Sequence, residues 1–150
     1  TYNTSYHVRA YAVNGKGVGY SAYVIIKTRS SAKATIVNMT ARNPSPSTLD
    51  VSATISADGG AEITERGFVY SSKGTPSVEE CEKKIVMKGT VGEIGTTLTG
   101  LTGYSNYSIR AYAINKNGTA YSNTVTARTK KTDPSIDDPA FPETKTIKNK

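Results

Sequence analysis

The sequence predicts an all-β protein whose main part is a sandwich of two antiparallel sheets. Three observations support this fold class: short stretches in which apolar and polar residues alternate, turn residues that recur about every 8–12 positions, and a composition rich in Thr, Ser and Tyr. The chain has 150 residues, with ten Tyr, two Phe and no Trp. The abundance of Ala, Leu, Glu and Lys that is typical of long helices is absent.

Seven strands are expected between residues 34 and 129, since apolar side chains occupy every second position of these stretches. The expected strands cover residues 34–41, 49–57, 64–71, 82–88, 95–101, 107–115 and 119–129. Two of the intervening turns carry strong local signals. Asp58-Gly59-Gly60 contains glycines that tolerate a positive φ, and Asn117-Gly118 is a signal for a tight hairpin.

An internal repeat sets the expected domain organisation. Residues 1–29 align without a gap with residues 102–130, at an offset of 101, and twelve of the 29 positions are identical. The identical residues of the first copy are Thr1, Tyr6, Arg9, Ala10, Tyr11, Ala12, Asn14, Gly17, Tyr20, Ser21, Val24 and Thr28. An offset near 100 residues matches the size of one small sandwich module. We therefore expect residues 33–130 to form a complete module and residues 1–29 to be the last hairpin of a truncated preceding module.

Residues 131–150 differ from the rest of the chain in composition. They contain three Pro, four basic and four acidic residues, and few large apolar side chains. Such a segment cannot bury enough surface to fold alone, so we expect a linker to a further domain. The other linker, Ser30-Ser31-Ala32, is so short that successive modules are expected to lie close together.

Composition excludes several functional classes. The formal net charge of +7 is spread along the chain, so we expect no concentrated basic face and no nucleic-acid binding. The longest apolar run, residues 23–26, is far shorter than a membrane span. One Cys and one His cannot make an internal disulfide and are a poor ligand set for zinc, so no metal or cofactor site is expected.

The groups that could carry chemistry are expected to be structural or solvated. The glycine-rich residues 15–19 are interpreted as a hairpin turn, because neither the spacing nor the helix of a phosphate-binding loop follows. The carboxylates within residues 62–65 and 79–82 are expected in solvated loops, and His7 lacks a nucleophile partner. Cys81 is expected to be a free, partly buried thiol, with an intermolecular disulfide as the alternative. We therefore expect no enzymatic activity.

The last expected hairpin resembles the end of a fibronectin type III domain. The resemblance rests on Leu101, Tyr107, the alternating small and apolar residues that follow, and the pair Asn115 and Gly118. Residues 63–71 resemble the third strand of the variant common in surface and secreted proteins of Bacteroidota. The resemblance covers roughly residues 33–130, with residues 1–29 as a partial copy.

This resemblance implies an immunoglobulin-like sandwich in which Leu101 and Tyr107 form a tyrosine corner. The ring of such a Tyr is buried between the sheets, and its hydroxyl bonds to nearby backbone. The chain departs from the family pattern in two places: it has no Trp on the second strand, and Gly103 stands where a Pro is usual before the corner. We expect Phe68 and Tyr70 to supply the missing aromatic volume.

One candidate binding surface follows from strand alternation. Arg110 and Tyr112 are expected on the outer face of their strand, and the repeat places Arg9 and Tyr11 in the same way. Exposed Tyr rings beside a cation can stack on a sugar or contact a partner protein. The alternative is that these residues only pair across neighbouring strands.

The resemblance implies a non-catalytic spacer or interaction module in a multidomain extracytoplasmic protein, either secreted or on the cell surface. Its expected partners are neighbouring domains of the same chain, with a protein or carbohydrate as a further partner class. Two alternatives are a carbohydrate-binding or adhesion module, and an accessory module of a secreted glycan-degrading enzyme. A sandwich of this kind hosts many roles, so fold alone does not separate these alternatives.

Overall fold

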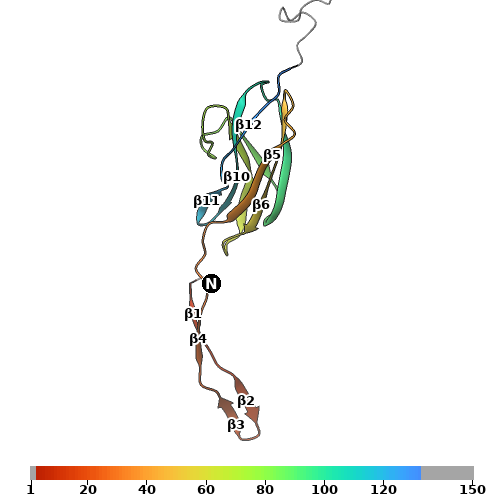
Figure 1. The fold of residues 1–150 in the computed structure, drawn as a ribbon. Helices are drawn as coiled ribbons and strands as arrows, with labels where there is room; N and C mark the ends of the chain where they lie inside the picture. Colours follow the sequence, from red (N-terminus) through yellow and green to blue (C-terminus); the bar gives the residue numbers. More distant parts are fainter. Residues whose placement is uncertain (1–2, 133–150) are drawn as a thin grey trace, which may run out of the picture.

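The computed structural model describes residues 3–132, which form twelve strands and no helix. Eight of these strands build a sandwich, and the first four form a separate hairpin that extends beyond one end of it (Figure 1). The expected all-β class is therefore confirmed. The linker expected over residues 131–150 lies, apart from its first two residues, outside the described part of the chain.

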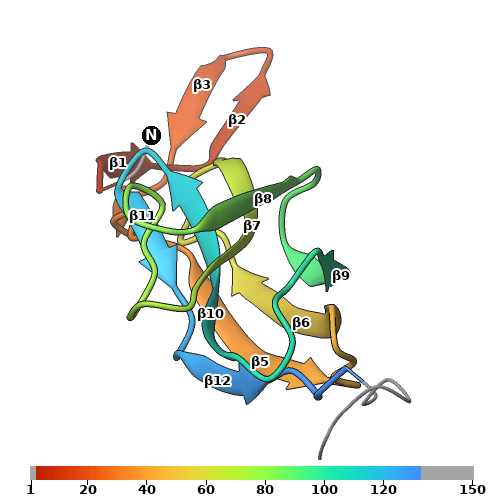
Figure 2. The same ribbon diagram turned by 90° about the horizontal axis from the view of Figure 1, so that it is seen from above.

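Two antiparallel sheets face each other in the sandwich (Figure 2). The first sheet has the order β5-β6-β9, with β5 (Thr35–Arg42), β6 (Thr48–Ala57) and β9 (Gly92–Thr99). The second has the order β11-β10-β7-β8, with β7 (Ile63–Ser71), β8 (Lys83–Met87), β10 (Asn106–Asn115) and β11 (Gly118–Tyr121), and β12 (Val125–Arg128) also pairs with β10. Strand β10 therefore has three partners and lies at the centre of its sheet.

The core lies between the sheets and follows the predicted alternation. Its buried side chains include Met39, Leu49, Val51, Ala53, Ile55, Phe68, Tyr70, Ile94, Leu98, Tyr107, Ile109, Ala111 and Ala113. Phe68 and Tyr70 supply aromatic volume to this core, as expected in a chain without Trp. On β10 every second residue from Tyr107 points inward, so the intervening residues lie on the outer face of the sheet.

The expected strand 119–129 is interrupted, and the structure has β11 and β12 in its place. The interruption is at Ser122, whose backbone N–H still donates to the Ala111 carbonyl at 3.0 Å. The Ala111 N–H, however, donates to the Ser122 hydroxyl at 3.0 Å, and that hydroxyl donates to the Asn123 carbonyl. The Ser122 hydroxyl oxygen thus accepts the bond that a backbone carbonyl would accept in a regular ladder. Residues 122–124 therefore do not pair as a strand.

The chain before β10 forms the corner that the resemblance implies. Leu101 and Tyr107 are both buried, and the backbone N–H of Thr102 donates to the Tyr107 hydroxyl at 2.9 Å. The ring of Tyr70 packs edge-on against that of Tyr107, with centroids 5.7 Å apart. The one polar atom of the Tyr107 side chain is therefore hydrogen-bonded although its ring is buried.

The hairpin at the start of the chain contains β1 (Ser5–Val8), β2 (Tyr11–Asn14), β3 (Gly17–Tyr20) and β4 (Val24–Lys27). Each strand corresponds to a segment of β10, β11 or β12 at the offset of 101. Tyr11 pairs with Tyr20, as Tyr112 pairs with Tyr121, and Ser21 repeats the side-chain bonds of Ser122. The two copies therefore share the same backbone pairing.

The two copies differ in how far their apolar side chains are buried. The Tyr6 side chain is 42% exposed and Val8 is 49% exposed, whereas Tyr107 is 2% exposed and Ile109 is fully buried. Both residues of the first copy lie on the face that is covered by the β5-β6-β9 sheet in the second copy. No sheet covers this face of the hairpin within residues 3–132.

The substitution Tyr107→Phe tests the corner. It keeps the ring in the core but leaves the Thr102 N–H without its acceptor, so we expect a loss of about 1–2 kcal/mol in the free energy of unfolding. Urea denaturation of the full chain measures this loss. Tyr104→Phe is the matched control, because Tyr104 is exposed, and it should leave the urea midpoint unchanged. An unchanged midpoint in Tyr107→Phe would contradict the structural role given to the hydroxyl.

Hydrogen exchange tests the difference in burial between the copies. Opening of the uncovered hairpin disrupts few buried apolar contacts, so the Val8 amide should exchange roughly 100-fold or more faster than the Ile109 amide. Both amides belong to antiparallel strands, which makes Ile109 the internal control. Equal protection at the two positions would show that pairing alone stabilises the hairpin.

Candidate functional site

The candidate site is the outer face of β7, β8, β10 and β11, together with residues 72–82, which connect β7 to β8. This connection folds back over the sheet and curls beside β11 (Figure 2). The Val78 N–H donates to the Tyr121 hydroxyl at 2.9 Å, and Pro76 is fully buried. The connection therefore covers part of the face on which binding residues were expected.

Tyr112 lies on the outer face of its sheet, as the alternation predicts, but its ring is not available to a partner. The side chain is 0% exposed, because residues 72–82 lie over this region of the sheet. The Tyr112 hydroxyl donates to Oε1 of Glu65 at 2.8 Å. Strand periodicity indicates the face on which a residue lies, but it contains no signal for a loop that folds onto that face.

The second predicted residue of this face, Arg110, is half-buried and makes internal contacts. Its guanidinium lies over the ring of Tyr121, 4.1 Å from the centroid, and its Nε–H donates to the Ser122 carbonyl at 3.3 Å. In the first copy, Arg9 lies over Tyr20 at 3.9 Å, whereas Tyr11 is 70% exposed. The hairpin copy thus leaves open the Tyr position that is covered in the sandwich.

A short charge network connects β7, β8 and β10, and the sequence analysis did not identify it. Nζ of Lys84 lies 3.0 Å from Oε1 of Glu65, the same oxygen that accepts the Tyr112 hydroxyl. Hydrogen bonds from Lys84 and then from Tyr112 hold the pKa of Glu65 below its ordinary value. Burial, followed by the hydrogen bond to Glu65, raises the pKa of Tyr112 well above its ordinary value. The network therefore favours an ionised Glu65 and a neutral Tyr112.

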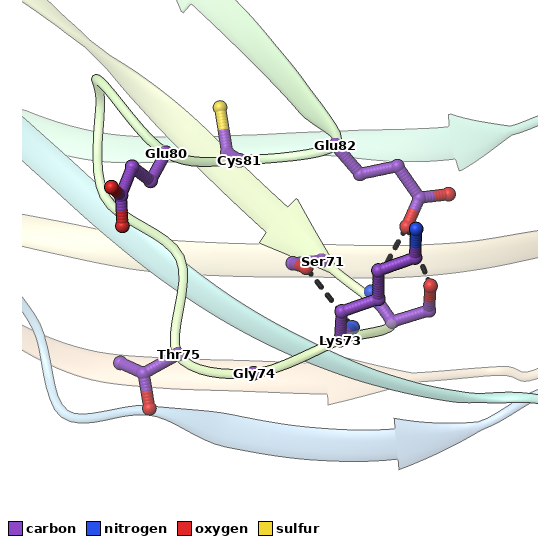
Figure 3. Close-up of a pocket in the computed structure, with 8 residues that line it drawn as sticks. Ser71, Lys73, Gly74, Thr75, Glu80, Cys81 and Glu82 are labelled. Carbon is purple, nitrogen blue, oxygen red and sulfur yellow. Dashed lines mark hydrogen bonds between the residues drawn. The ribbon is translucent and has the colours of Figure 1, made fainter.

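An open cleft of about 640 Å³ lies where β7 ends and the connection to β8 begins (Figure 3). It is lined by Ser71, Ser72, Lys73, Gly74, Thr75, Glu80, Cys81 and Glu82. The Glu82 carboxylate accepts hydrogen bonds from the Ser72 N–H at 3.0 Å and from its hydroxyl at 2.7 Å, and these bonds lower the pKa of Glu82. This carboxylate closes the base of the loop.

The cleft holds no arrangement typical of a reactive centre. Cys81 is a free, half-buried thiol, and His7 belongs to the distant hairpin, where its ring packs on Tyr23. Within residues 3–132 no group of three His, Cys, Asp or Glu side chains could hold a metal ion. The same part of the chain has no helix that could cross a membrane.

A second feature that sequence reasoning missed lies in the turn that precedes β10. Tyr104 has a φ of 56°, an unusual value for a bulky residue, and its ring is exposed. The guanidinium of Arg128 lies 3.6 Å from the ring centroid, and Nζ of Lys131 lies 4.9 Å from it. The faces of this ring are therefore in contact with cations of the same chain.

Solved structures with the same arrangement identify the fold. One match is the sensor domain of the anti-sigma factor RsgI4 from Pseudobacteroides cellulosolvens, with a TM-score of 0.51, 16% identity, and coverage of 69% of this chain and 100% of that one. A second is the chicken CNTN1 fragment with domains FN1–FN3, with a TM-score of 0.51, 20% identity, and coverage of 87% of this chain. A third is a fibronectin type III domain from the human KIAA0970 protein, with a TM-score of 0.47, 18% identity, and coverage of 69% and 78%. The likeness to the two structures with a TM-score of 0.51 shows that the fold is that of a fibronectin type III domain.

In the terms of that fibronectin type III fold, β5, β6 and β9 form one sheet, and the other five strands of the sandwich form the second. The chain spans 44% of the chicken CNTN1 fragment. With sequence identities of 20% or less, these matches show the fold of the chain but indicate no specific activity. No protein-family model matches the sequence, and no curated protein matches it.

The pH dependence of stability tests the charge network. The folded-state pKa of Glu65 is lowered, so its contribution to stability is present above the unfolded pKa and is lost as the pH falls through the folded value. We expect Glu65→Gln to unfold at lower urea than the wild type at pH 7. The difference between the two should begin to shrink below about pH 4, near the ordinary pKa of a Glu side chain, and should close only as the pH falls through the lowered folded-state pKa.

Glu79→Gln is the matched control for this pH series. Glu79 is exposed on the connection of residues 72–82, and its side chain has no ion pair within the described residues. Its urea midpoint should follow that of the wild type at every pH. A gap between Glu65→Gln and the wild type that is the same at pH 7 and pH 3 would contradict an ionic role for Glu65.

Proposed function

We propose that this chain is a non-catalytic spacer or interaction module of a multidomain extracytoplasmic protein. The observation that carries the proposal is the second copy of the last hairpin. Residues 3–29 repeat the registers of β10 with β11 and β12, and the sandwich begins a few residues later. A hairpin with an uncovered apolar face directly before a complete sandwich is the arrangement of modules in tandem, so neighbouring domains of the same chain are the primary partners.

The placement of the aromatic residues favours the spacer over a carbohydrate-binding module. Sugar binding needs an open ring face, and of the two Tyr residues predicted for binding, Tyr112 is buried and only Tyr11 of the hairpin is open. The rings of Tyr121, Tyr20 and Tyr104 each lie beneath an Arg side chain of the same chain. Each of these rings contacts an Arg side chain of the same chain, which supports a structural role for the Arg and Tyr pairs.

The extracytoplasmic location is supported by the resemblance of residues 63–71 to the variant found in surface and secreted proteins. The likeness to the sensor domain of an anti-sigma factor is compatible with a module in a multidomain protein. An antibody against this chain tests the location by fractionation of cells and by protease treatment of intact cells. We expect the antigen to be cleaved on intact cells or found in the medium. Protection from protease until the cells are lysed would contradict the proposed location.

A binding screen tests the spacer assignment. Immobilised chain of residues 1–150 is exposed to a glycan array, and we expect no saturable binding. The variants Tyr11→Ala and Arg9→Ala remove the most exposed Tyr ring of the hairpin and the cation that lies over Tyr20, and they leave the sandwich unchanged. Saturable binding to a glycan that these variants abolish would overturn the spacer assignment in favour of the carbohydrate-binding alternative.

A further inference from the structure

The backbone of Ala32 makes most of the hydrogen bonds between the linker and the sandwich. The Ala32 N–H donates to the carbonyl of Gly59 at 2.8 Å. The Ala32 carbonyl accepts hydrogen bonds from Nδ2 of Asn115 at 2.8 Å and from Nδ2 of Asn117 at 2.9 Å. Both backbone polar groups of Ala32 are therefore satisfied by one end of the sandwich, although the residue itself is exposed.

The groups that hold Ala32 are themselves fixed. Asn115 is 4% exposed, and its amide also donates to the Asp58 carbonyl at 2.7 Å, while its Oδ1 accepts the N–H of Asn117 at 2.9 Å. Gly59 has a φ of 73°, and a Cβ built there would collide with the carbonyl oxygens of Ala32 and Lys33. Only glycine allows this approach. The site therefore contacts the backbone of the linker and makes no hydrogen bond that depends on its side chains, apart from that of Ser31.

Little free chain remains between the hairpin and the sandwich. The Arg29 carbonyl accepts the Asn3 N–H at 3.0 Å, which closes the base of the hairpin. The Ser31 hydroxyl donates to Oδ1 of Asn117 at 3.2 Å, which attaches the linker to the sandwich. One residue, Ser30, lies between these two anchors, so rotation about very few backbone bonds sets the direction of the hairpin.

The first copy retains the key residue of this site. Asn14 occupies the position of Asn115, and its Oδ1 accepts the N–H of Lys16 at 2.9 Å, as that of Asn115 accepts the N–H of Asn117. The structure records no hydrogen bond from Nδ2 of Asn14 to any of residues 3–132. In the second copy the side-chain amide of Asn115 donates to the linker, whereas the corresponding amide of Asn14 makes no such bond within residues 3–132.

We propose that residues 58–60 and 115–117 form a docking site for the extended backbone of the preceding linker, and that this site fixes the direction of one module relative to the one before it. The proposal rests on the tandem arrangement proposed above, and it makes the array a stiff rod. A flexible string of independent modules is the alternative. The occupant is residues 31–33 of this chain, and the Asn14 site takes the equivalent linker of the module before.

Backbone dynamics of the ¹⁵N-labelled chain test the proposal. We expect order parameters of about 0.85 for Ser31 and Lys33, equal to those of the sandwich strands. In Asn117→Ala and in the double variant Asn115→Ala with Asn117→Ala, these values should fall below about 0.6. Exchange of the Ala32 amide should become about tenfold faster or more. Asn123→Ala is the matched control, since its exposed side chain lies between β11 and β12 and has no hydrogen bond to the linker, and it should change neither quantity.

A second variant keeps the test decisive if the loss of buried Asn115 unfolds the sandwich. Ala32→Pro removes the N–H that bonds to Gly59 and leaves every core residue in place. Protection of the Ile109 amide reports whether the sandwich is intact in each variant. Low order parameters at Ser31 and Lys33 in the wild type, or unchanged values in both Asn117→Ala and Ala32→Pro, would overturn the proposal. Either result leaves the fractionation and the glycan screen to decide the proposed function independently.

Discussion

Burial of the inner face of β10 against the β5-β6-β9 sheet is the interaction on which the rest of the structure depends. Strand β10 pairs with three other strands, and Tyr107, Ile109 and Ala111 bring its side chains into the core. The hairpin at the start of the chain shows what remains without that sheet. Its registers, turns and cation contacts are the same, but its apolar side chains are exposed. Backbone pairing is therefore encoded within the hairpin, whereas burial requires the rest of the module.

The contacts at the linker end of the sandwich and on its outer face follow from this arrangement. Because β10 and β11 are fixed by the core, the turn between them holds Asn115 and Asn117 beside the turn at Gly59, and these groups together hold the incoming linker. The outer face is used internally, by residues 72–82 and by the Arg110 contact with Tyr121.

Much of the fold could be predicted from the sequence, because its signals are local or periodic. Alternation placed Ile109 and Ala111 inside, and the repeat indicated that residues 1–29 pair as residues 102–130 do. The burial of Tyr112 and the hydrogen bonds to the backbone of Ala32 could not be predicted in this way. Each depends on hydrogen bonds between positions far apart in the chain, such as Asn115 to Ala32 and Tyr112 to Glu65. Such bonds leave no period in the sequence.

A transplant of the hairpin tests the central claim most directly. In this variant residues 102–130 are replaced by the sequence of residues 1–29, so that one chain carries the same hairpin twice, once uncovered and once against the β5-β6-β9 sheet. Amide exchange of the two copies is then compared in a single sample. The account predicts that the transplanted copy is protected and unfolds cooperatively with the sandwich, while the identical first copy exchanges rapidly. A chain in which neither copy is protected, or both are equally so, would contradict it.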